Sequence, residues 1–305
     1  MKKIVLAGGS GFLGQILTKH FSALGWKVVI LSRSPRKGNE AEIEWVVWDG
    51  KTQGNWVNQV NGADVLVNLA GRSVNCRYNE KNKADIYASR LDATKVLGEA
   101  MAQCSTPPKV FIQTASATIY RHSLEKDMDE RQGEIGDGFS VDVCNKWEHL
   151  FWQIDAPQTR KVLLRVAMVM GREGGAYEAY SNLAKMGIGG KQGSGKQYVS
   201  WIHEIDFAQM VAFAIDNDDV VGTYNCSAPE PVPNAQFMSY LRQSHHRPFD
   251  LPAPEWMLEL GAFFMGTETE LVLKSRRVVP TKMVEKGFQF QYPKAREALL
   301  DLSNG

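Results

Sequence analysis

A glycine-rich run near the N-terminus has the spacing of a phosphate-binding loop. It satisfies both G-x-x-G-x-x-G and G-x-G-x-x-G. Glycines at this spacing permit a tight turn, let the backbone approach a pyrophosphate and allow the next helix to pack on the preceding strand. The alternative is a turn with no ligand, but a strand before the run and a helix after it favour a dinucleotide, whose phosphates would meet the free N–H groups of the helix. The run consists of Gly8, Gly9, Ser10, Gly11, Phe12, Leu13 and Gly14.

An arginine-containing segment after the second expected strand indicates which dinucleotide this is. A site for NAD usually has Asp or Glu there, which accepts a hydrogen bond from the ribose 2′-hydroxyl. This chain has Arg33 and Arg36, with no carboxylate before Glu40. Either the two guanidinium groups bind a 2′-phosphate, aided by a serine such as Ser32, or they are solvated on a loop. The pattern favours NADP (NADPH), with Asp49 placed either to accept from the adenine amino group or to cap the next turn.

Short apolar runs and longer amphipathic segments alternate through the first half and must position these motifs. Near-continuous apolar runs are typical of parallel strands that are covered on both faces. Strand–helix alternation indicates right-handed crossovers. The sequence therefore predicts an α/β fold with a Rossmann-type doubly wound parallel sheet. The expected strands are Lys3–Ala7, Lys27–Leu31, Ile43–Trp48, Val65–Leu69, Lys109–Thr114 and Val162–Val169, and the expected helices are Phe12–Leu24, Asn82–Gln103 and Val141–Ile154.

The second half has a different pattern and is expected to form a smaller C-terminal α/β lobe beside a cleft. We expect an NADP-binding domain over residues 1–170 and a substrate-side lobe with a helical tail over residues 171–305, interleaved with the first domain. Three prolines within Pro229–Pro233 predict a connection that is neither helix nor strand. Asp206 is expected to N-cap a helix. Other helices are expected at Tyr177–Lys185, Asn234–Gln243, Glu255–Phe264 and Pro293–Leu300.

Composition excludes several classes of function. The 305 residues are 44% hydrophobic and 23% charged, which are ordinary globular values. A net charge of +1 gives no electrostatic footprint for nucleic acid or an anionic membrane. No stretch approaches the 18 uncharged apolar residues of a membrane helix. The four cysteines form no C-x-x-C pair, so we expect no metal site and a cytoplasmic protein with reduced thiols.

Several motifs together resemble those of extended short-chain dehydrogenases/reductases. They are Gly8–Gly14, Asn68-Leu69-Ala70-Gly71 at the end of the fourth strand, Ser116-Ala117-Thr118-Ile119-Tyr120 after the fifth, and Leu164-Arg165 with Gly171. The run Gly193–Gln197, the following Ser200-Trp201-Ile202-His203 and the tail with Gly287-Phe288 are similar to an atypical, NAD-dependent epimerase/dehydratase-like subgroup that has a C-terminal domain of unknown function. The resemblance covers essentially the whole chain. It implies a Rossmann-type fold and NADP binding, with cofactor contacts from Asn68, Leu69, Ala70, Gly71 and Arg90, but no known substrate.

The acid/base pair of the wider family is missing from this chain. Most members use Tyr-x-x-x-Lys, in which the lysine lowers the pKa of the tyrosine. None of the nine tyrosines here has a lysine four residues later. Ser116 matches the family's catalytic serine and would hydrogen-bond a substrate oxygen, or else cap the strand end. Tyr120 is the best-placed alternative phenol, unless it is a packed aromatic.

Four further residues are candidates for the substrate side of the cleft. Arg77 and Arg90 could bind a carboxylate or phosphate of the substrate, or pair with carboxylates on helix surfaces. Trp201 and His203 would share one face of a strand. That face could line the pocket, with Trp201 as an apolar wall and His203 as a titratable group, although a lone histidine is more often structural.

Two functions remain open on the sequence alone. The first is an NADP(H)-dependent oxidoreductase or epimerase-like enzyme that acts on a small polar, potentially anionic substrate. The second is a non-catalytic NADPH-binding sensor or regulatory protein, which the missing Tyr-x-x-x-Lys pair favours. A homodimer through the Asn82–Gln103 helix is possible, although the apolar face of that helix could equally cover the sheet.

Overall fold

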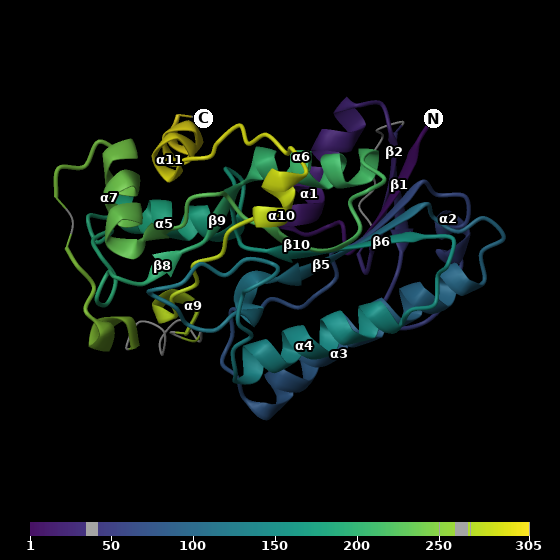
Figure 1. The fold of residues 1–305 in the computed structure, drawn as a ribbon, viewed down its shortest axis with the longest axis horizontal. Coiled ribbons are helices and arrows are strands. Elements are labelled where there is room, and N and C mark those ends of the chain that lie inside the picture. Colours follow the sequence, from purple (N-terminus) through teal and green to yellow (C-terminus); the bar gives the residue numbers. More distant parts are fainter. Residues whose placement is uncertain (35–41, 250, 260–267, 269, 305) are drawn as a thin grey trace.

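The centre of the molecule is a seven-stranded sheet whose neighbouring strands are all parallel, with order β10-β6-β5-β4-β1-β2-β3 (Figure 1). The computed structural model describes residues 1–34, 42–249, 251–259, 268 and 270–304. Strand order reverses between β1 and β4, as in doubly wound sheets, so the predicted Rossmann-type fold is confirmed. The strands are β1 (Lys3–Ala7), β2 (Lys27–Ser32), β3 (Ile43–Val47), β4 (Val65–Asn68), β5 (Val110–Ser116), β6 (Arg160–Val166) and β10 (Gly222–Cys226).

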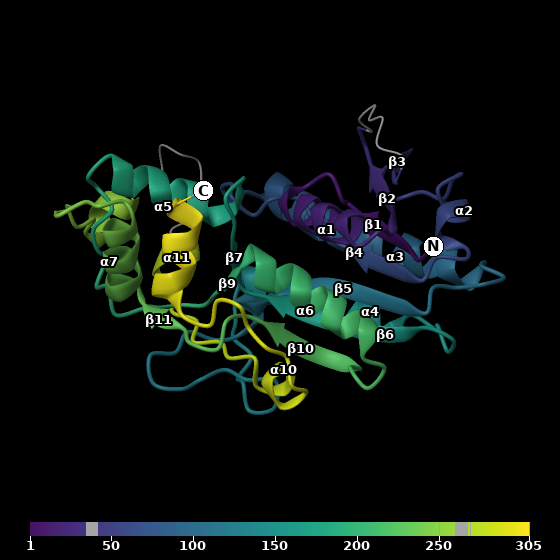
Figure 2. The ribbon, with the colours of Figure 1, turned by 90° about the horizontal axis from the view of Figure 1, so that it is seen from above.

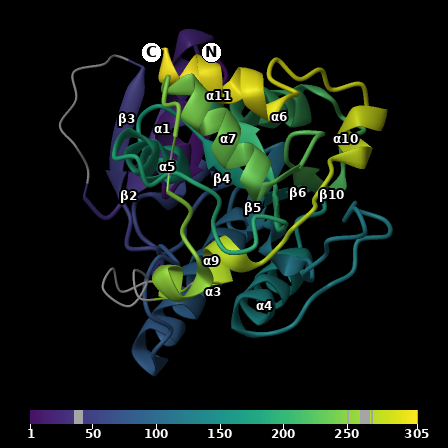
Figure 3. The same ribbon diagram turned by 90° about the vertical axis from the view of Figure 1, so that its left-hand side faces the viewer.

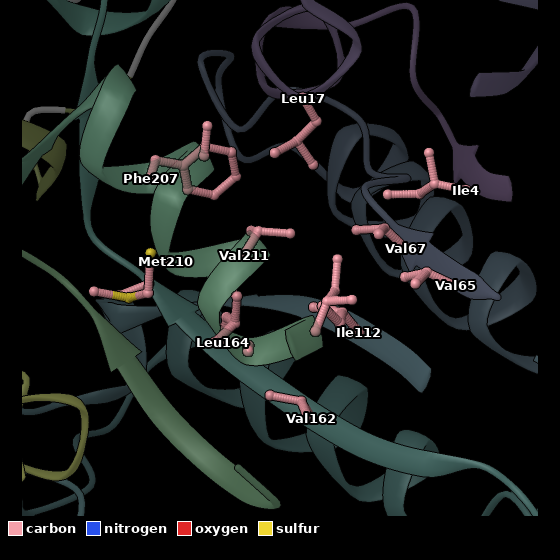
Figure 4. Close-up of a cluster of buried hydrophobic side chains, with 14 of the residues drawn as sticks. Ile4, Leu17, Val65, Val67, Ile112, Val162, Leu164, Phe207, Met210 and Val211 are labelled. Atoms are coloured by element: carbon pink, nitrogen blue, oxygen red, sulfur yellow. The ribbon is translucent and has the colours of Figure 1, made fainter. Parts of the chain in front are cut away.

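Helices cover both faces of this sheet, because successive apolar residues of each strand point to opposite sides. One face carries α1 (Phe12–Ala23) and α6 (Glu204–Asp216), where Leu17 and Phe207 pack over strand residues such as Ile4 (Figure 4). The other carries α3 (Glu80–Ala102) and α4 (Phe139–Gln153), which lie on the opposite side of the sheet in Figure 1. The short elements α2 (Val57–Val60) and η1 (Ala117–Ile119) complete this part.

A smaller lobe extends from the carboxyl ends of the strands, on the side away from the N-terminus (Figure 2). Its core joins Tyr177, Trp201, Phe237 and Leu299 from four elements. Figure 3 looks onto this lobe. The elements are β7 (Met168–Met170), α5 (Gly175–Lys185), β8 (Tyr198–Val199), β9 (Trp201–His203), β11 (Val232–Pro233), α7 (Asn234–Ser244), α9 (Glu270–Leu273), α10 (Thr281–Glu285) and α11 (Ala295–Ser303).

Part of the second half of the chain lies outside the smaller lobe. β10 is a strand of the main sheet, and α6 packs on one face of that sheet. The expected strand Val162–Val169 divides into β6 and β7, since β7 leaves the main sheet and pairs with β9 instead. The prediction that Pro229–Pro233 contains no strand is wrong at the end of this segment. There Val232 and Pro233 form β11, which pairs with β8 in a two-stranded sheet. Residues 255–259 are helical, and the rest of the expected helix Glu255–Phe264 lies outside the described residues.

The apolar face of α3 is used inside the chain. Ala93, Val96, Leu97 and Met101 are buried against the sheet. The sequence left open whether this face forms a dimer interface or covers the sheet, and the structure shows that it covers the sheet. The homodimer therefore remains a prediction without support from this face. Within the described residues, no helix combines the length and the apolar character that a membrane crossing requires.

Candidate functional site

The candidate site lies at the point where strand order reverses. The glycine-rich loop follows β1 and the Asn68–Gly71 segment follows β4, and β1 and β4 are neighbours in the sheet. Between these loops lies a cavity of about 650 Å³. Crevices at this position, outside the carboxyl ends of the strands, are where open α/β sheets bind ligands. Eight predicted cofactor residues line it, namely Gly8, Ser10, Gly11, Ser32, Arg33, Leu69, Ala70 and Gly71.

Two glycines of the loop show why the motif requires this residue type. Gly8 has φ +79°, and a Cβ there would lie 2.9 Å from the backbone Cα of Ala70. A Cβ on Gly14 would lie 2.2 Å from the carbonyl oxygen of Gly9. The first glycine therefore lets the β1 and β4 loops meet, and the second lets α1 begin directly against the turn.

The start of α1 presents backbone donors to the cavity region. The N–H groups of Ser10, Phe12 and Leu13 donate no hydrogen bond within the described part of the chain. The first turn of α1 also has no acidic residue, and no side chain caps it. Free N–H groups together with the positive end of a helix dipole are typical of phosphate-binding sites.

Asn68 holds the loop that follows β4 in place. It is fully buried, and its Oδ1 accepts a hydrogen bond from the Ala70 N–H at 3.0 Å. Its Nδ2 donates to Oε1 of Gln113 at 2.9 Å and to Thr94 at 3.2 Å. Because all of this amide's polar atoms are used inside the protein, Asn68 holds the loop and does not reach the cavity itself.

The lining of the cavity also includes two of the residues predicted for the 2′-phosphate. Ser32 and Arg33 line it, together with Lys51, which sequence reasoning did not identify. Arg36 lies outside the described residues. Asp49 accepts from the N–H groups of Lys51 and Thr52 at 2.8 and 2.9 Å, which is the turn-capping alternative of the two expected for it.

The remaining lining residues were not predicted as site residues. Arg72 is held by ion pairing to Asp85 and by a 2.8 Å hydrogen bond to Asn82. Its backbone N–H donates to Ser89 at 2.9 Å, so α3 fixes the loop after β4. Several of them adjoin predicted residues in the sequence, since Leu31 precedes Ser32, Gly50 follows Asp49 and Arg72 follows Gly71. The full set is Leu31, Trp48, Gly50, Lys51, Arg72, Ser73, Asp85, Ala88 and Ser89.

Ser116 lies at the carboxyl end of β5, half-buried, as predicted for the family serine. Its Oγ accepts from the Thr118 N–H at 3.2 Å and donates to Thr118 Oγ1 at 2.9 Å. The side chain therefore caps the turn η1. The structure thus shows the capping contact, while the position at the sheet edge leaves a substrate contact as a proposal.

Tyr120 is a packed aromatic, which is the alternative that the sequence left open. Its side chain is fully buried in a cluster with Met128. The hydroxyl accepts from Arg165 Nη1 at 2.8 Å and donates to Oδ1 of Asn225 at 2.9 Å. Arg165 itself forms a two-pronged ion pair with Glu148 at 2.8 and 2.9 Å. Burial raises the pKa of Tyr120. A phenol held in this network does not line the described cavity.

Trp201 and His203 are both buried in the lobe, away from the cavity lining. The indole of Trp201 packs in the lobe core and donates to the Glu230 carbonyl at 3.1 Å. His203 is the N-cap of α6, since its Nδ1 accepts from the Ile205 N–H at 3.1 Å. The expected N-cap, Asp206, lies in the first turn instead. Its carboxylate accepts from the N–H groups of Gln291 and Tyr292.

Arg77 lies in the loop after β4, and Arg90 lies on α3. The structure shows neither arginine in an ion pair with a carboxylate of α3. Arg77 Nη1 lies 3.5 Å from Oε2 of Glu268, in the C-terminal part. Arg90 stacks on the Trp147 ring, with 5.1 Å between its Cζ and the ring centroid. Neither residue lines the described cavity. Nor do the described residues contain a cluster of three or more His, Cys, Asp or Glu side chains that could hold a metal ion.

Comparison with known proteins agrees with this geometry. The family described as NAD dependent epimerase/dehydratase matches residues 4–227, and a domain of unknown function, DUF1731, matches residues 253–302. The epimerase family protein YfhF of Bacillus subtilis (strain 168) is 35% identical over 301 residues, which is 98% of this chain and 97% of that protein.

Solved structures show the same arrangement. The structure of human epimerase family protein SDR39U1 (isoform 2) with NADPH is 29% identical, covers 99% of both chains and has a TM-score of 0.88. A nucleoside-diphosphate sugar epimerase from Corynebacterium glutamicum is 27% identical with a TM-score of 0.76, over 99% of this chain and 58% of that one. The resemblance inferred from the motifs is confirmed, and this chain belongs to the NAD dependent epimerase/dehydratase family, with a C-terminal DUF1731 domain.

Proposed function

We propose that the protein is an NADP(H)-dependent oxidoreductase or epimerase-like enzyme that acts on a small polar substrate. The observation that carries the proposal is the cavity at the β1–β4 reversal. Its lining includes both the glycine loop, which would contact the pyrophosphate of NADP, and Ser32 with Arg33, which would contact the 2′-phosphate on the adenine ribose. The human relative that was solved with NADPH supports the choice of cofactor.

The residues present fit such a cofactor. The glycine cradle has no room for a Cβ at Gly8 or Gly14, so the backbone itself forms the wall that a pyrophosphate would contact. The N–H groups of Ser10 and Phe12, which donate to no acceptor among the described residues, would bind its oxygens. Arg33 would pair with the 2′-phosphate. When bound, the nicotinamide would supply the hydride chemistry.

Ser116 is the predicted acid/base candidate that this proposal retains. Tyr120 and His203 are both fully buried, and the Tyr120 hydroxyl and the His203 Nδ1 form hydrogen bonds with protein groups. Ser116 is half-buried at the carboxyl edge of the sheet, where it would orient a substrate oxygen. A serine hydroxyl does not ionise near neutral pH, so we infer that a bound water would carry the proton beside it.

A non-catalytic NADPH sensor is the second candidate. It is favoured by the absence of a Tyr-x-x-x-Lys pair and by the engagement of Tyr120 with Arg165 and Asn225. Mixing the protein with NADPH and a panel of carbonyl compounds and nucleotide sugars, and following NADPH absorbance, separates the two. Turnover that falls in Ser116→Ala supports the enzyme. Tight NADPH binding with no turnover on any substrate supports the sensor.

The variant Arg33→Ala tests whether the protein prefers NADPH to NADH. Loss of an arginine on a 2′-phosphate should weaken NADPH binding by about tenfold or more and leave NADH binding nearly unchanged. Arg131→Ala is the matched control, since Arg131 lies in an exposed ion pair with Glu285. Calorimetric titration of each variant with both cofactors measures the difference. Equal loss for NADPH and NADH would contradict the 2′-phosphate assignment.

A further inference from the structure

The ends of β2 and β3 lie side by side at the cavity. The two strands are parallel neighbours with Ser32 opposite Val47, and the Trp48 N–H donates to the Ser32 carbonyl at 2.9 Å. The segments that follow the two strands therefore leave the sheet next to each other. Arg33 comes directly after β2, and Lys51 comes three residues after Trp48. Both of these cations line the cavity, as does Ser32.

A tight turn keeps Lys51 close to the end of β3. The Asp49 carboxylate accepts from the N–H groups of Lys51 and Thr52 at 2.8 and 2.9 Å, and from the Thr52 hydroxyl at 2.6 Å. Gly50 has φ +79°, which lets the chain reverse there. Three residues span at most about 11 Å when extended, and this turn shortens that span. The long side chains of Lys51 and Arg33 can therefore reach one group between the two strand ends.

The ammonium group is what Lys51 can offer to a ligand, because its backbone N–H is already bound by Asp49. The Lys51 side chain is 62% exposed, and its Nζ lies 3.8 Å from Oδ2 of Asp92 on α3. This distance is too long for a hydrogen bond. An exposed ion pair of this kind contributes little to stability. A phosphate can therefore attract the ammonium away from Asp92 at small cost.

The charges of the lining leave these two cations without a counter-charge. Among the described residues that line the cavity, Asp85 is the one carboxylate, and it is paired with Arg72. Arg33 and Lys51 are the other charged residues of the lining. The Asp49 carboxylate is not part of the lining and is held by three donors of its own turn. A phosphate monoester carries about two negative charges near neutral pH, which two cations would balance.

We propose that Lys51 binds the 2′-phosphate of NADP together with Arg33, so that each of the two neighbouring strand ends supplies one cation. The proposal rests on the proposed function for the presence of NADP in this cavity, and it adds a second residue that determines cofactor specificity. The planar guanidinium of Arg33 can bind two phosphate oxygens, and the ammonium of Lys51 can then bind the third as a point charge. NADH has no 2′-phosphate, so Lys51 contributes to the choice of cofactor and not to the binding of the part that both cofactors share.

Calorimetric titration of Lys51 variants with NADPH and NADH tests this. In Lys51→Met we expect the dissociation constant of NADPH to rise about fivefold and that of NADH to stay unchanged. Lys51→Arg should keep the preference for NADPH, and Lys51→Glu should weaken NADPH more than Lys51→Met does. A structural role of Lys51 predicts equal changes for both cofactors. Equal weakening of NADPH and NADH in Lys51→Met would therefore overturn the proposal.

The matched control is Lys95→Met. Lys95 lies on α3, outside the cavity lining, with a side chain that is 70% exposed and an Nζ that is 3.9 Å from Oε1 of Glu99. Its ion pair therefore has nearly the exposure and length of the pair between Lys51 and Asp92. We expect Lys95→Met to bind both cofactors as the wild type does. If it weakens NADPH as much as Lys51→Met, the effect belongs to the net charge of the protein and the proposal fails.

Two nucleotide fragments separate the 2′-phosphate from the rest of the cofactor. 2′-AMP and 5′-AMP are each titrated as competitors of NADPH into the wild type, Lys51→Met and Arg33→Ala. We expect both variants to weaken 2′-AMP and to leave 5′-AMP unchanged. Absence of NADPH binding in the wild type would contradict the proposed function itself. Weaker NADPH and 2′-AMP binding in Arg33→Ala, with both ligands unaffected in Lys51→Met, would overturn this inference alone.

Discussion

At the scale of single residues, Gly14 gives the sharpest test of the cofactor cradle. In Gly14→Ala the new Cβ would lie 2.2 Å from the Gly9 carbonyl oxygen, which the turn cannot move without opening the loop. We expect a loss of about 1–3 kcal/mol in the free energy of unfolding and weaker NADPH binding. Gly54→Ala is the control, because its nearest neighbour is a Trp56 side-chain atom at 3.5 Å. Urea unfolding and NADPH fluorescence titration measure both. Wild-type NADPH affinity in Gly14→Ala would contradict the cradle.

The same scale shows which site residues a sequence can reveal. The glycines are recognisable because the turn, and the ligand proposed for it, constrain the backbone itself. Arg72 carries no motif, and its place in the cavity lining is fixed by its side-chain contacts with Asp85 and Asn82 of α3. Tyr120 shows the converse case. Its position after β5 is as expected, but Asn225 from β10 and Arg165 from β6 occupy its hydroxyl, and neither contact can be inferred from local sequence.

At the scale of elements, His203 links the start of α6 to the C-terminal helix. Its Nε2 lies 3.3 Å from Oδ2 of Asp301 on α11, and its ring packs on Tyr292 with 4.1 Å between centroids. Burial lowers the pKa of His203 from 6.5 to about 4. The unfolded chain therefore binds the proton more readily than the folded chain between these two values. The contribution of His203 to stability is fully present above pH 6.5 and is lost as pH falls towards 4, by up to about 3 kcal/mol.

The variant His203→Asn tests this. Asparagine still accepts from the helix N-terminus but does not titrate, so the slope of the unfolding free energy against pH between 6.5 and 4 should become shallower. His149→Asn, on the exposed side of α4, is the control and should keep the wild-type slope. Urea unfolding at half-unit pH steps measures the slopes. An unchanged slope in His203→Asn would contradict the assignment.

Elements with a strong pattern were predictable, and those without one were not. The expected strands from Lys3–Ala7 to Lys109–Thr114 are observed within a few residues, since buried parallel strands need continuous apolar runs. β10, with the sequence GTYNC, was missed because Asn225 and Thr223 interrupt any such run. Asn225 is tolerated there because it hydrogen-bonds the carbonyls of Met128 and Val279, which fixes neighbouring loops to the sheet edge.

At the scale of the whole molecule, the C-terminal domain is joined to the rest by buried hydrogen bonds. Ser200 accepts from the Val278 N–H at 2.8 Å and donates to the Arg276 carbonyl at 2.6 Å. The Met128 N–H donates to the Arg277 carbonyl at 2.7 Å. Met283 and Phe288 are part of the hydrophobic core on the α6 face of the main sheet. The two regions matched by separate families therefore share one core and one set of backbone partners.

This sharing predicts a single cooperative unfolding transition. Buried donors and apolar surface on the main sheet would lose their partners if the C-terminal domain opened alone, and each such group makes a partly open state unfavourable. Differential scanning calorimetry should give one peak, with a calorimetric enthalpy equal to the van't Hoff enthalpy. A chain ending at residue 227 should lack that peak and expose apolar surface to a dye such as ANS. Two resolved transitions in the full chain, or native-like melting of the shortened one, would show that the domains fold independently.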